Sequence, residues 1–401
     1  MGKKGMKRRD FLGSAAAGIV GAGVAMSPIK AHAEEKPKKT KFIFRPLGKT
    51  GVSLPIVSFG VMNSDSPDLL NRSLDMGIKH LDSAHGYLRG NSERVIGEVL
   101  EQRGDRSKII VSTKMYLDRD REKKIFTTGG PNGATEENFF KLLEISLERL
   151  RSEYVDILYL HSMYSPDMVT YEPMLNALVK AKKQGKARFI GCTTHSDEHI
   201  NIRAAVDTGV YEVIQTAFNF VQEKKEDIKD SIAYAAKNGV GIVAMKTQGG
   251  RRLQETQEVN HTAALKWVLS NENVTTAIPG MTTFDQLDLN MSVMNDLAMS
   301  KKEKSDLASA VSMKGLLYCQ QCRACVSTCP SSTEIPDLMR AYMYAEAYKN
   351  HLQAVDTIAE LPQRKGLDAC RRCASCSAKC ANGIQIGQRV NKLISDRYYL
   401  G

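Results

Sequence analysis

The chain has 401 residues, of which 42% are hydrophobic and 25% charged, so it can hold one large soluble globular domain and a smaller one. Its formal net charge of +11 suggests nucleic-acid binding, but the first 33 residues hold six cations and one anion, which leaves +6 for the rest. No basic stripe interleaved with aromatic residues occurs in the sequence, so binding to nucleic acid is not expected.

Residues 1–33 have the pattern of an export signal. A basic stretch with Arg8 and Arg9 precedes the apolar residues 15–26, which are too few to span a bilayer comfortably. The segment RRDFL (8–12) resembles a twin-arginine signal, and AHA (31–33) is a small-x-small cleavage site. The resemblance implies export of the folded protein to the periplasm, cleavage near Ala33 and only transient contact with the membrane. An uncleaved membrane anchor is the alternative, and residues 34–41 form a basic linker.

Residues 42–298 alternate short apolar runs with amphipathic helical patterns such as NFFKLLEISLERL (138–150). Eight β–α units over about 260 residues match a (β/α)8 TIM barrel of the α/β class, and a doubly wound sheet is the competitor. No G-x-G-x-x-G follows the first strand, which argues against a Rossmann site. The predicted strands are IVSFG (56–60), KHLD (79–82), KIIVSTK (108–114), VDILYLH (155–161), ARFIGC (187–192), EVIQTA (212–217), GIVAMK (241–246) and TTAIPG (275–280).

Polar residues stand where several of these strands end. Asp82 ends the second strand, Lys114 the third and His161 the fourth, and Tyr87 lies in the loop after the second. The C-terminal ends of the strands carry the active site in this architecture. An ammonium paired with a carboxylate favours a phenolate, so we expect Lys114 to lower the pKa of Tyr87 and to make it an acid–base group. A buried structural network of Asp82, Lys114 and His161 is the alternative.

Residues 299–401 hold two copies of one cysteine spacing, C-x2-C-x2-C-x3-C. Thiolates are soft ligands that suit iron, and this short spacing lets one loop direct three sulfurs at one cluster. We therefore expect two [4Fe-4S] clusters, with the fourth cysteine of each run serving the other cluster. The predicted ligands are Cys319, Cys322 and Cys325 with Cys380 for one cluster, and Cys370, Cys373 and Cys376 with Cys329 for the other.

Disulfides and zinc are the alternatives for these cysteines. An exported protein can form disulfides, whereas zinc motifs usually offer paired C-x2-C units rather than runs of four. The spacer between the runs includes residues 335–361, which have a helical pattern with few breakers. The sequence thus predicts a small, mainly helical ferredoxin-like domain after the barrel.

Residues 42–298 resemble the aldo/keto reductase family. The resemblance rests on FRPLGKTGVSLPIVSFG, LDSAHGY with NSERVIG, STK, YVDILYLHS and GKARFIGCTTH. The family's catalytic tetrad falls residue by residue on Asp82, Tyr87, Lys114 and His161. This implies interconversion of a small carbonyl compound and an alcohol, with Tyr87 as acid or base and His161 orienting the substrate oxygen.

The resemblance also implies a nicotinamide nucleotide, NAD(H) or NADP(H), although its contacts depart from the family pattern. The Ser-Asn pair that holds the carboxamide is Thr193-Thr194 here, whereas Gln215 matches the family's glutamine. Met245 replaces the aromatic residue that stacks on the nicotinamide. Lys246 follows it and either meets the pyrophosphate or is a surface charge.

The positions that hold the 2′-phosphate in the family depart further. The family's lysine and arginine are Gly280 and Gln286 here, and Asn290 follows at the place of the family's asparagine. Losing both cations removes charge-assisted contacts, so the sequence favours NADH, or a nucleotide held differently, over NADPH.

Two functions follow from these features. The first is an exported oxidoreductase whose carbonyl/alcohol chemistry is coupled to electron transfer through the two clusters. A hydride carries two electrons and a cluster accepts one, so a flavin, a redox partner protein or a quinone-linked carrier is expected as well, and the sequence leaves a flavin open. The second is an electron-transfer iron–sulfur protein whose barrel is a scaffold that no longer uses diffusible NAD(P)H.

Overall fold

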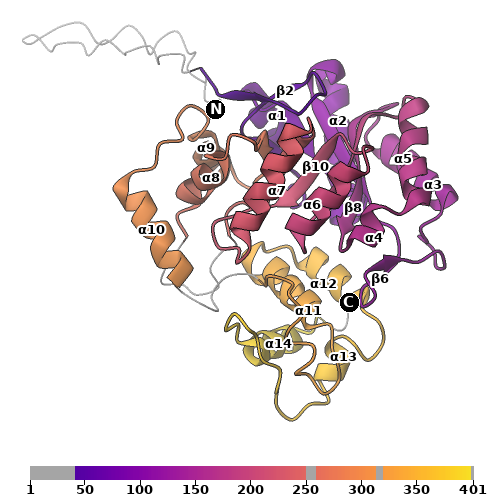
Figure 1. Cartoon of the computed structure of the whole chain (residues 1–401), viewed down its shortest axis with the longest axis vertical. Coiled ribbons are helices and arrows are strands. Elements are labelled where there is room, and N and C mark those ends of the chain that lie inside the picture. Colours follow the sequence, from indigo (N-terminus) through magenta and orange to yellow (C-terminus); the bar gives the residue numbers. More distant parts are fainter. Residues whose placement is uncertain (1–40, 250–258, 313–318, 399–401) are drawn as a thin grey trace, which may run out of the picture. The chain divides into compact units, whose positions relative to one another are not determined.

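A computed structural model describes residues 41–249, 259–312 and 319–398. The predicted signal (1–33), its cleavage site at Ala33 and nearly all of the linker lie outside these residues. The described residues belong to one compact unit, Lys41–Gly401 (Figure 1). Within this described part, no helix is long and apolar enough to cross a membrane.

The central sheet has eight strands in the order β12-β11-β10-β9-β8-β5-β4-β3, and all its pairs are parallel. Its two edges meet, because Val57 bridges Ala277 and Gly60 bridges Gly280. This closure confirms the predicted (β/α)8 barrel and excludes the doubly wound sheet, whose edges stay open. The strands, each on a predicted run, are β3 (Phe59–Gly60), β4 (His80–Asp82), β5 (Ile110–Met115), β8 (Val155–Met163), β9 (Ala187–Thr194), β10 (Val213–Ala217), β11 (Gly241–Met245) and β12 (Thr276–Ala277).

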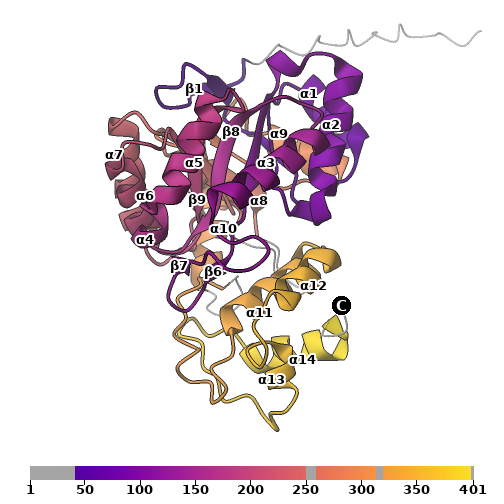
Figure 2. The ribbon, with the colours of Figure 1, turned by 90° about the vertical axis from the view of Figure 1, so that its right-hand side faces the viewer.

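Helices cover the outside of the strands (Figure 2). The predicted helix 138–150 is α3 (Glu136–Arg149), and it begins after Thr135, whose Oγ1 accepts a hydrogen bond from Asn138 N at 3.2 Å. The other outer helices and the short 3₁₀ helix η2 are α1 (Pro67–Asp75), α2 (Asn91–Arg103), η2 (Arg106–Lys108), α4 (Pro166–Val169), α5 (Glu172–Lys183), α6 (Glu198–Asp207), α7 (Lys225–Lys237), α8 (His261–Leu269) and α9 (Phe284–Met291). Two small antiparallel hairpins are β1 (Phe44–Pro46) with β2 (Ser53–Pro55), and β6 (Arg119–Asp120) with β7 (Ile125–Phe126).

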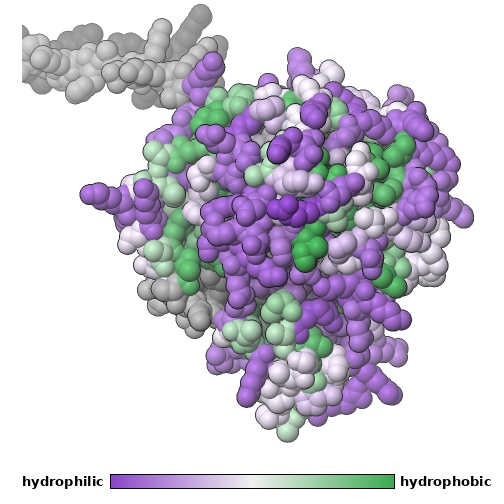
Figure 3. All heavy atoms as spheres, viewed as in Figure 1, coloured by the Kyte–Doolittle hydropathy of each residue, from purple (hydrophilic) through white to green (hydrophobic). Residues whose placement is uncertain are grey.

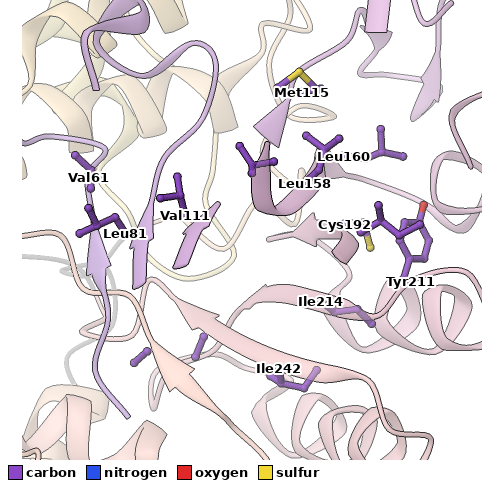
Figure 4. Close-up of a cluster of buried hydrophobic side chains, with 14 of the residues drawn as sticks. Val61, Leu81, Val111, Met115, Leu158, Leu160, Cys192, Tyr211, Ile214 and Ile242 are labelled. Atoms are coloured by element: carbon purple, nitrogen blue, oxygen red, sulfur yellow. The ribbon is translucent and has the colours of Figure 1, made fainter. Parts of the chain in front are cut away.

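The main hydrophobic core lies between the strands and the helices. Figure 4 shows side chains from several strands, among them Leu81, Leu158 and Ile242, packed in one cluster. Cys192 belongs to the same core, and burial raises the pKa of its thiol, so it is inert as its apolar strand predicts. On the face seen in Figure 3, hydrophilic side chains predominate and hydrophobic ones are scattered.

The C-terminal region consists of short helices around a second core that includes Leu338, Val390 and Leu393. The predicted helix over 335–361 is interrupted: a π-helical turn follows its first part, Lys349 adopts a left-handed φ of 53°, and the Asn350 side chain caps a new helix. The elements are α11 (Ile335–Tyr342), η3 (Met343–Ala347), α12 (His351–Ala359), α13 (Leu367–Cys370) and α14 (Ile386–Ser395). These elements confirm a mainly helical domain after the barrel.

Helix α10 (Lys301–Ser312) packs on the barrel rather than on this second core. Its Leu307 joins a small apolar cluster with Ala263 and Ala264 of α8 and with Phe220. Lys266 Nζ of α8 donates to Glu303 Oε1 of α10 at 2.9 Å, which adds a partly buried ion pair. The helix thus extends the barrel's packing beyond residue 298.

Candidate active site

The four residues singled out from the sequence lie together at one end of the barrel. Asp82 ends β4, Lys114 lies in β5, His161 lies in β8, and Tyr87 begins the short helix η1 (Tyr87–Gly90). Asp82, Tyr87 and His161 line a cavity of about 900 Å³. Lys114 lies directly behind it, with its Nζ 2.6 Å from Asp82 Oδ2.

Lys114 is fully buried and holds the base of the site together. Its Nζ donates hydrogen bonds to Asp82 Oδ2 and to the carbonyl oxygen of Ser83. The same Nζ lies 5.1 Å from the centroid of the Tyr87 ring. Burial lowers the pKa of Lys114, and the Asp82 carboxylate opposes that shift. The pair therefore places a positive charge beside the phenol ring without leaving either buried charge alone.

Two residues that the sequence interpretation missed position the Asp82 carboxylate. Ser112 Oγ donates to Asp82 Oδ1 at 2.6 Å, and it also lies 2.9 Å from His80 Nε2. Because the serine hydrogen goes to the carboxylate, the serine oxygen accepts from His80 Nε2–H. Both residues are completely buried. The signal that identifies them is the period of two along a strand, which points Ser112 the same way as Lys114, and His80 the same way as Asp82.

The prediction that the pKa of Tyr87 is lowered is wrong. Burial, followed by the charge of Asp82, raises the pKa of Tyr87 well above 10, whereas Lys114 was expected to lower it. The physical reason is that the phenol is partly buried in the cavity wall near the Asp82 carboxylate, so its charged form is disfavoured. Tyr87 is therefore a neutral hydroxyl at pH 7, which suits it to donate a proton.

His161 lies beside Tyr87, and its ring meets the phenol edge-to-face at 5.8 Å between centroids. Tyr116 contacts the other side of His161 in the same manner, at 5.7 Å. Burial lowers the pKa of His161 well below 6.5, and the charge of Lys114 acts in the same direction. A neutral imidazole between two aromatic rings can hydrogen-bond a substrate oxygen without adding a charge to the site.

Stability is expected to fall as the pH drops below about 6.5, in part because of His80. Burial lowers the pKa of His80 from 6.5 to about 4, so between these values the unfolded chain binds a proton that the folded chain does not. Lower pH therefore favours unfolding, by about 3 kcal/mol over the whole window for this residue. Urea unfolding between about pH 7 and pH 5 measures the slope. His80→Gln, which retains a donor toward Ser112, should reduce that slope by about one proton, and an unchanged slope would contradict the assignment.

The C-terminal domain forms one wall of the cavity, which no local sequence pattern indicated. Arg340, Tyr344 and Tyr348 are among its lining residues, and they come from α11, η3 and the turn that follows. Charges on Tyr344 and Tyr348 act, after burial and Asp82, to raise the pKa of Tyr87. The cavity at the barrel mouth is therefore shared between the two domains.

Ion pairs connect the C-terminal domain to the barrel. Arg121, which follows β6, contacts Asp337 Oδ1 and Glu360 Oε2, both at 2.9 Å. Arg89 Nη2 lies 2.7 Å from Asp356 Oδ1, in a more exposed position. Asp337 is nearly inaccessible, so the Arg121 pair is the one that is shielded from solvent.

Six of the eight residues predicted to contact a nucleotide line the cavity, but Thr193 and Thr194 do not. The Thr193 hydroxyl accepts a hydrogen bond from Ser162 N at 2.8 Å, and the Thr194 hydroxyl bonds Met163 O at 3.1 Å. Gln215 does reach the cavity, and its buried Oε1 has no hydrogen-bond partner among the described residues. That free acceptor can receive a hydrogen bond from the carboxamide N–H₂ of a nicotinamide. Gln215 is therefore suited to hold the nicotinamide end of a nucleotide.

The positions predicted near the adenosine end line the cavity as well but bring no cation. Gln286 Oε1 accepts hydrogen bonds from Thr282 N at 2.8 Å and from the Thr282 hydroxyl at 3.2 Å. Asn290 Oδ1 accepts from Gln248 Nε2 at 2.8 Å. A Cβ on Gly280 would meet nothing closer than 3.9 Å, so the space for a longer side chain exists there. These residues do not fit a 2′-phosphate, which calls for cationic donors.

None of the nine cysteines forms a disulfide. Burial, and then the charges of nearby cysteines, raises the pKa of Cys319 and of Cys370, each to about 11. The cysteines that act on Cys319 are Cys322 and Cys380, and those that act on Cys370 are Cys329, Cys373 and Cys376. Three cysteines of one run and the fourth of the other thus lie close enough to interact, which is what crosswise ligation needs.

Backbone N–H groups face two of these sulfurs. Gln321 N donates to Cys319 Sγ at 3.4 Å, and Asn382 N donates to Cys380 Sγ at 3.3 Å. Such bonds stabilise thiolates and tune cluster potentials, so the residues fit iron–sulfur clusters. In residues 41–249, 259–312 and 319–398, no three His, Cys, Asp or Glu side chains converge as a single metal ion would require. A cluster of four irons is larger than one ion, and its four ligands need not converge on one point.

Comparison with known proteins agrees with this architecture. The Aldo/keto reductase family profile matches residues 58–262, just over half of the chain, and a 4Fe-4S dicluster domain matches residues 315–384. The L-glyceraldehyde 3-phosphate reductase of Escherichia coli K12 is 24% identical over 66% of this chain and 91% of its own. The L-galactose dehydrogenase of Arabidopsis thaliana is 26% identical over 64% and 90%.

A solved structure shows the same fold. The aldo-keto reductase of Bacillus halodurans, in its holo form, aligns with a TM-score of 0.54 over 67% of this chain and 96% of its own, at 20% identity. The barrel, the residues at its mouth and the family match agree. The chain therefore belongs to the aldo/keto reductase family, and it is an oxidoreductase that carries a 4Fe-4S dicluster domain after its barrel.

Proposed function

We propose that this oxidoreductase interconverts a small carbonyl compound and its alcohol, with Tyr87 as the proton donor or acceptor, and passes electrons through two [4Fe-4S] clusters. One observation carries the proposal: the neutral Tyr87 hydroxyl lines the shared cavity beside a buried Lys114–Asp82 pair. A phenol beside a buried ammonium–carboxylate pair, at the strand ends of a barrel, is the arrangement that proton transfer to a substrate oxygen requires.

Four residues have distinct roles in the proposed proton transfer. His161 hydrogen-bonds the substrate oxygen and aims it at Tyr87. Tyr87 donates its proton as negative charge develops on that oxygen, and the Lys114 ammonium stabilises the phenolate that remains. Asp82, held by Ser112, keeps the lysine in place. In the oxidative direction, the same phenolate accepts the alcohol proton.

The cofactors supply the redox chemistry when they are bound. A nicotinamide nucleotide supplies or removes hydride, and Gln215 with Met245 would hold its nicotinamide end. Gly280 and Gln286 favour NADH over NADPH, since neither offers a charge to a 2′-phosphate. Cys319, Cys322, Cys325 and Cys380 would hold one cluster, and Cys329, Cys370, Cys373 and Cys376 the other. Such clusters would supply one-electron transfer. Because a hydride carries two electrons, a flavin, a redox partner protein or a quinone-linked carrier completes the path.

Export by the twin-arginine route belongs to the same proposal. Its support is the segment RRDFL with the small-x-small site that ends at Ala33, and the cysteine runs agree with it, because clusters must be inserted before a folded protein is exported. The protein would then act in the periplasm after cleavage near Ala33. N-terminal sequencing of the protein recovered from the periplasmic fraction tests this, and recovery of an uncleaved chain in the membrane fraction would contradict it.

The second candidate is an electron-transfer protein whose barrel is a scaffold. The observation in its favour is the cation-free lining at Gly280, Gln286 and Asn290, together with the absence of Thr193 and Thr194 from the lining of the described cavity. Under this alternative the clusters exchange electrons with partners and no nucleotide binds.

Tyr87→Phe separates the two functions. If Tyr87 is the acid–base group, removing its hydroxyl should lower the rate of carbonyl reduction by about a hundredfold to ten-thousandfold. The assay follows NADH and NADPH oxidation with a panel of small aldehydes and ketones, on the purified holoprotein. Reduction of the clusters by dithionite, read by EPR, should be unchanged.

The control for this experiment is Tyr234→Phe. That tyrosine lies on α7 and donates to Asp207 Oδ1 at the surface, so its loss should not affect turnover. If wild type and Tyr87→Phe reduce no carbonyl and bind neither nucleotide, while both accept electrons, the scaffold alternative holds.

A further inference from the structure

We propose that the shared cavity contains a binding site for an anionic group of the substrate, a carboxylate or a phosphate, formed by Lys246 and His195 of the barrel with Arg340 of the cluster domain. This inference rests on the proposed function and deepens it, because it defines the substrate as a carbonyl or alcohol compound that carries such a group.

Lys246 is the cavity cation whose charge is not matched by an ion pair. The other charged residues of the lining have an opposite charge within 4 Å, whereas Lys246 has none among residues 41–249, 259–312 and 319–398. The matched pairs are Asp82–Lys114 (2.6 Å), Arg89–Asp356 (2.7 Å), Arg121–Glu360 (2.9 Å), Arg340–Asp337 (3.5 Å) and Lys349–Glu346 (3.6 Å).

The backbone directs Lys246 into the cavity at some cost. It follows β11 with a left-handed φ of 54°, which a non-glycine residue seldom adopts, and Asn219 Nδ2 donates to its carbonyl oxygen at 3.0 Å. Burial, followed by the charge of Arg340, lowers the pKa of Lys246 to about 7. An anion bound beside Lys246 would restore its charge, since a nearby opposite charge favours the charged form of a partly buried ammonium.

Unsatisfied donors surround the same part of the cavity. Arg340 Nε, His195 Nδ1 and Thr247 Oγ1 are buried, belong to cavity-lining residues and have no hydrogen-bond partner among the described residues. Arg340 is otherwise held in place, since its Nη2 donates to Gln321 Oε1 at 2.8 Å. His195 Nε2 contacts Ser162 Oγ at 3.0 Å, so if the serine donates, Nδ1 carries the free N–H.

The donors belong together in space. The charges of Lys246 and Arg340 both act on the partly buried ring of His195, after the effect of burial, to lower its pKa well below 6.5. Three donors and one ammonium that face one region match the several acceptor oxygens of a carboxylate or phosphate. Tyr87 and His161 line the same cavity, so an anion held there leaves the rest of a small substrate within it.

Two other roles for Lys246 have to be separated from this one. Glu198 and Cys319 are the opposing charges that act on Lys246, so the lysine could instead balance the charge of the cluster that Cys319 would hold. Glu198 is already hydrogen-bonded to Gln222 Nε2 at 3.0 Å. The diphosphate of a nucleotide offers the same chemistry as a substrate phosphate and is the second source to distinguish.

The test is calorimetric binding to the full-length holoprotein, without turnover. The probes are L-lactate against 1,2-propanediol, glycerol 3-phosphate against glycerol, and ADP. In wild type, at least one anionic probe should bind about tenfold to a hundredfold more tightly than its neutral partner. Lys246→Met should abolish that difference, Lys246→Arg should retain it, and Lys246→Gln replaces the Met variant if that variant does not fold.

Two control variants show whether the preference for anions depends on Lys246 itself and whether it is independent of turnover. Lys349→Met removes another cavity cation, one that is largely exposed and paired with Glu346, and should leave the preference unchanged. Tyr87→Phe should retain the preference although turnover is lost, so failure of this inference and failure of the proposed function are distinguishable.

Three results would overturn the inference. The first is the absence of any preference for an anion in wild type. The second is a Lys246→Met variant that loses affinity for ADP only, which would assign the site to a nucleotide diphosphate. The third is a Lys246→Met variant that still binds anions but has a shifted midpoint potential for one cluster, measured by EPR. That result would make Lys246 a counter-charge for that cluster.

Discussion

Replacing Lys114 with methionine is expected to lower the turnover number by about a hundredfold to ten-thousandfold. Without the ammonium, the phenolate that forms when Tyr87 gives up its proton has no adjacent positive charge. The pKa of Tyr87 is already raised by burial, so its conjugate base is especially dependent on that charge. Steady-state kinetics of carbonyl reduction measures the effect, and it should appear in kcat rather than in KM.

The same substitution should also destabilise the protein, by about 3–5 kcal/mol, because it leaves the Asp82 carboxylate buried and unpaired. The double variant Lys114→Met/Asp82→Asn removes that unpaired charge. It should recover most of the stability in urea unfolding but none of the turnover. Lys108→Met, at an exposed position just before β5, is the control for both measurements. A double variant that regained activity would contradict the role given to Lys114.

Replacing Arg121 with methionine is expected to loosen the cluster domain from the barrel. The substitution removes the nearer of the two arginines that pair with the almost inaccessible Asp337, and it removes the partner of Glu360. We therefore expect a loss of about 3 kcal/mol in the attachment of this domain. Hydrogen exchange of α11 and α12 should rise, while that of the barrel strands stays unchanged. Carbonyl reduction should fall as well, since one wall of the cavity is then displaced.

Arg89→Met provides the comparison for this prediction. The Arg89–Asp356 pair links the same two domains, but the arginine side chain is 61% exposed, and such pairs contribute less than about 1 kcal/mol. Equal exchange in the two variants would show that the Arg121 pairs do not hold the domain in place.

The cavity wall is connected to one of the two cysteine groups. Arg340 lines the cavity and also bonds Gln321, whose backbone N–H faces Cys319 Sγ. The predicted cluster at Cys319 is thus joined to the cavity wall by two side chains. The other cysteine group includes Cys373 and Cys376, which are exposed.

Several features of this protein were determined by the sequence by itself. The eight strands were predictable because an apolar run followed by an amphipathic helix is a local pattern that a barrel repeats. The 4Fe-4S dicluster domain was predictable because a cluster constrains cysteine spacing within one loop. Asp82, Lys114 and His161 were predictable because strand ends meet at one face of the barrel. Each of these inferences needs only residues that are close in the chain or equivalent by topology.

Other features were decided only by the tertiary structure. That Arg121 pairs with Asp337, and that Lys246, His195 and Arg340 share one cavity, depends on how the cluster domain packs on the barrel, and no local pattern encodes that contact. The pKa of Tyr87 was predicted in the wrong direction for the same reason. The sequence indicates which charge lies near the phenol, but the solvation of the phenol depends on every group that packs around it. Here burial raises the pKa, and the charge of Asp82 acts in the same direction.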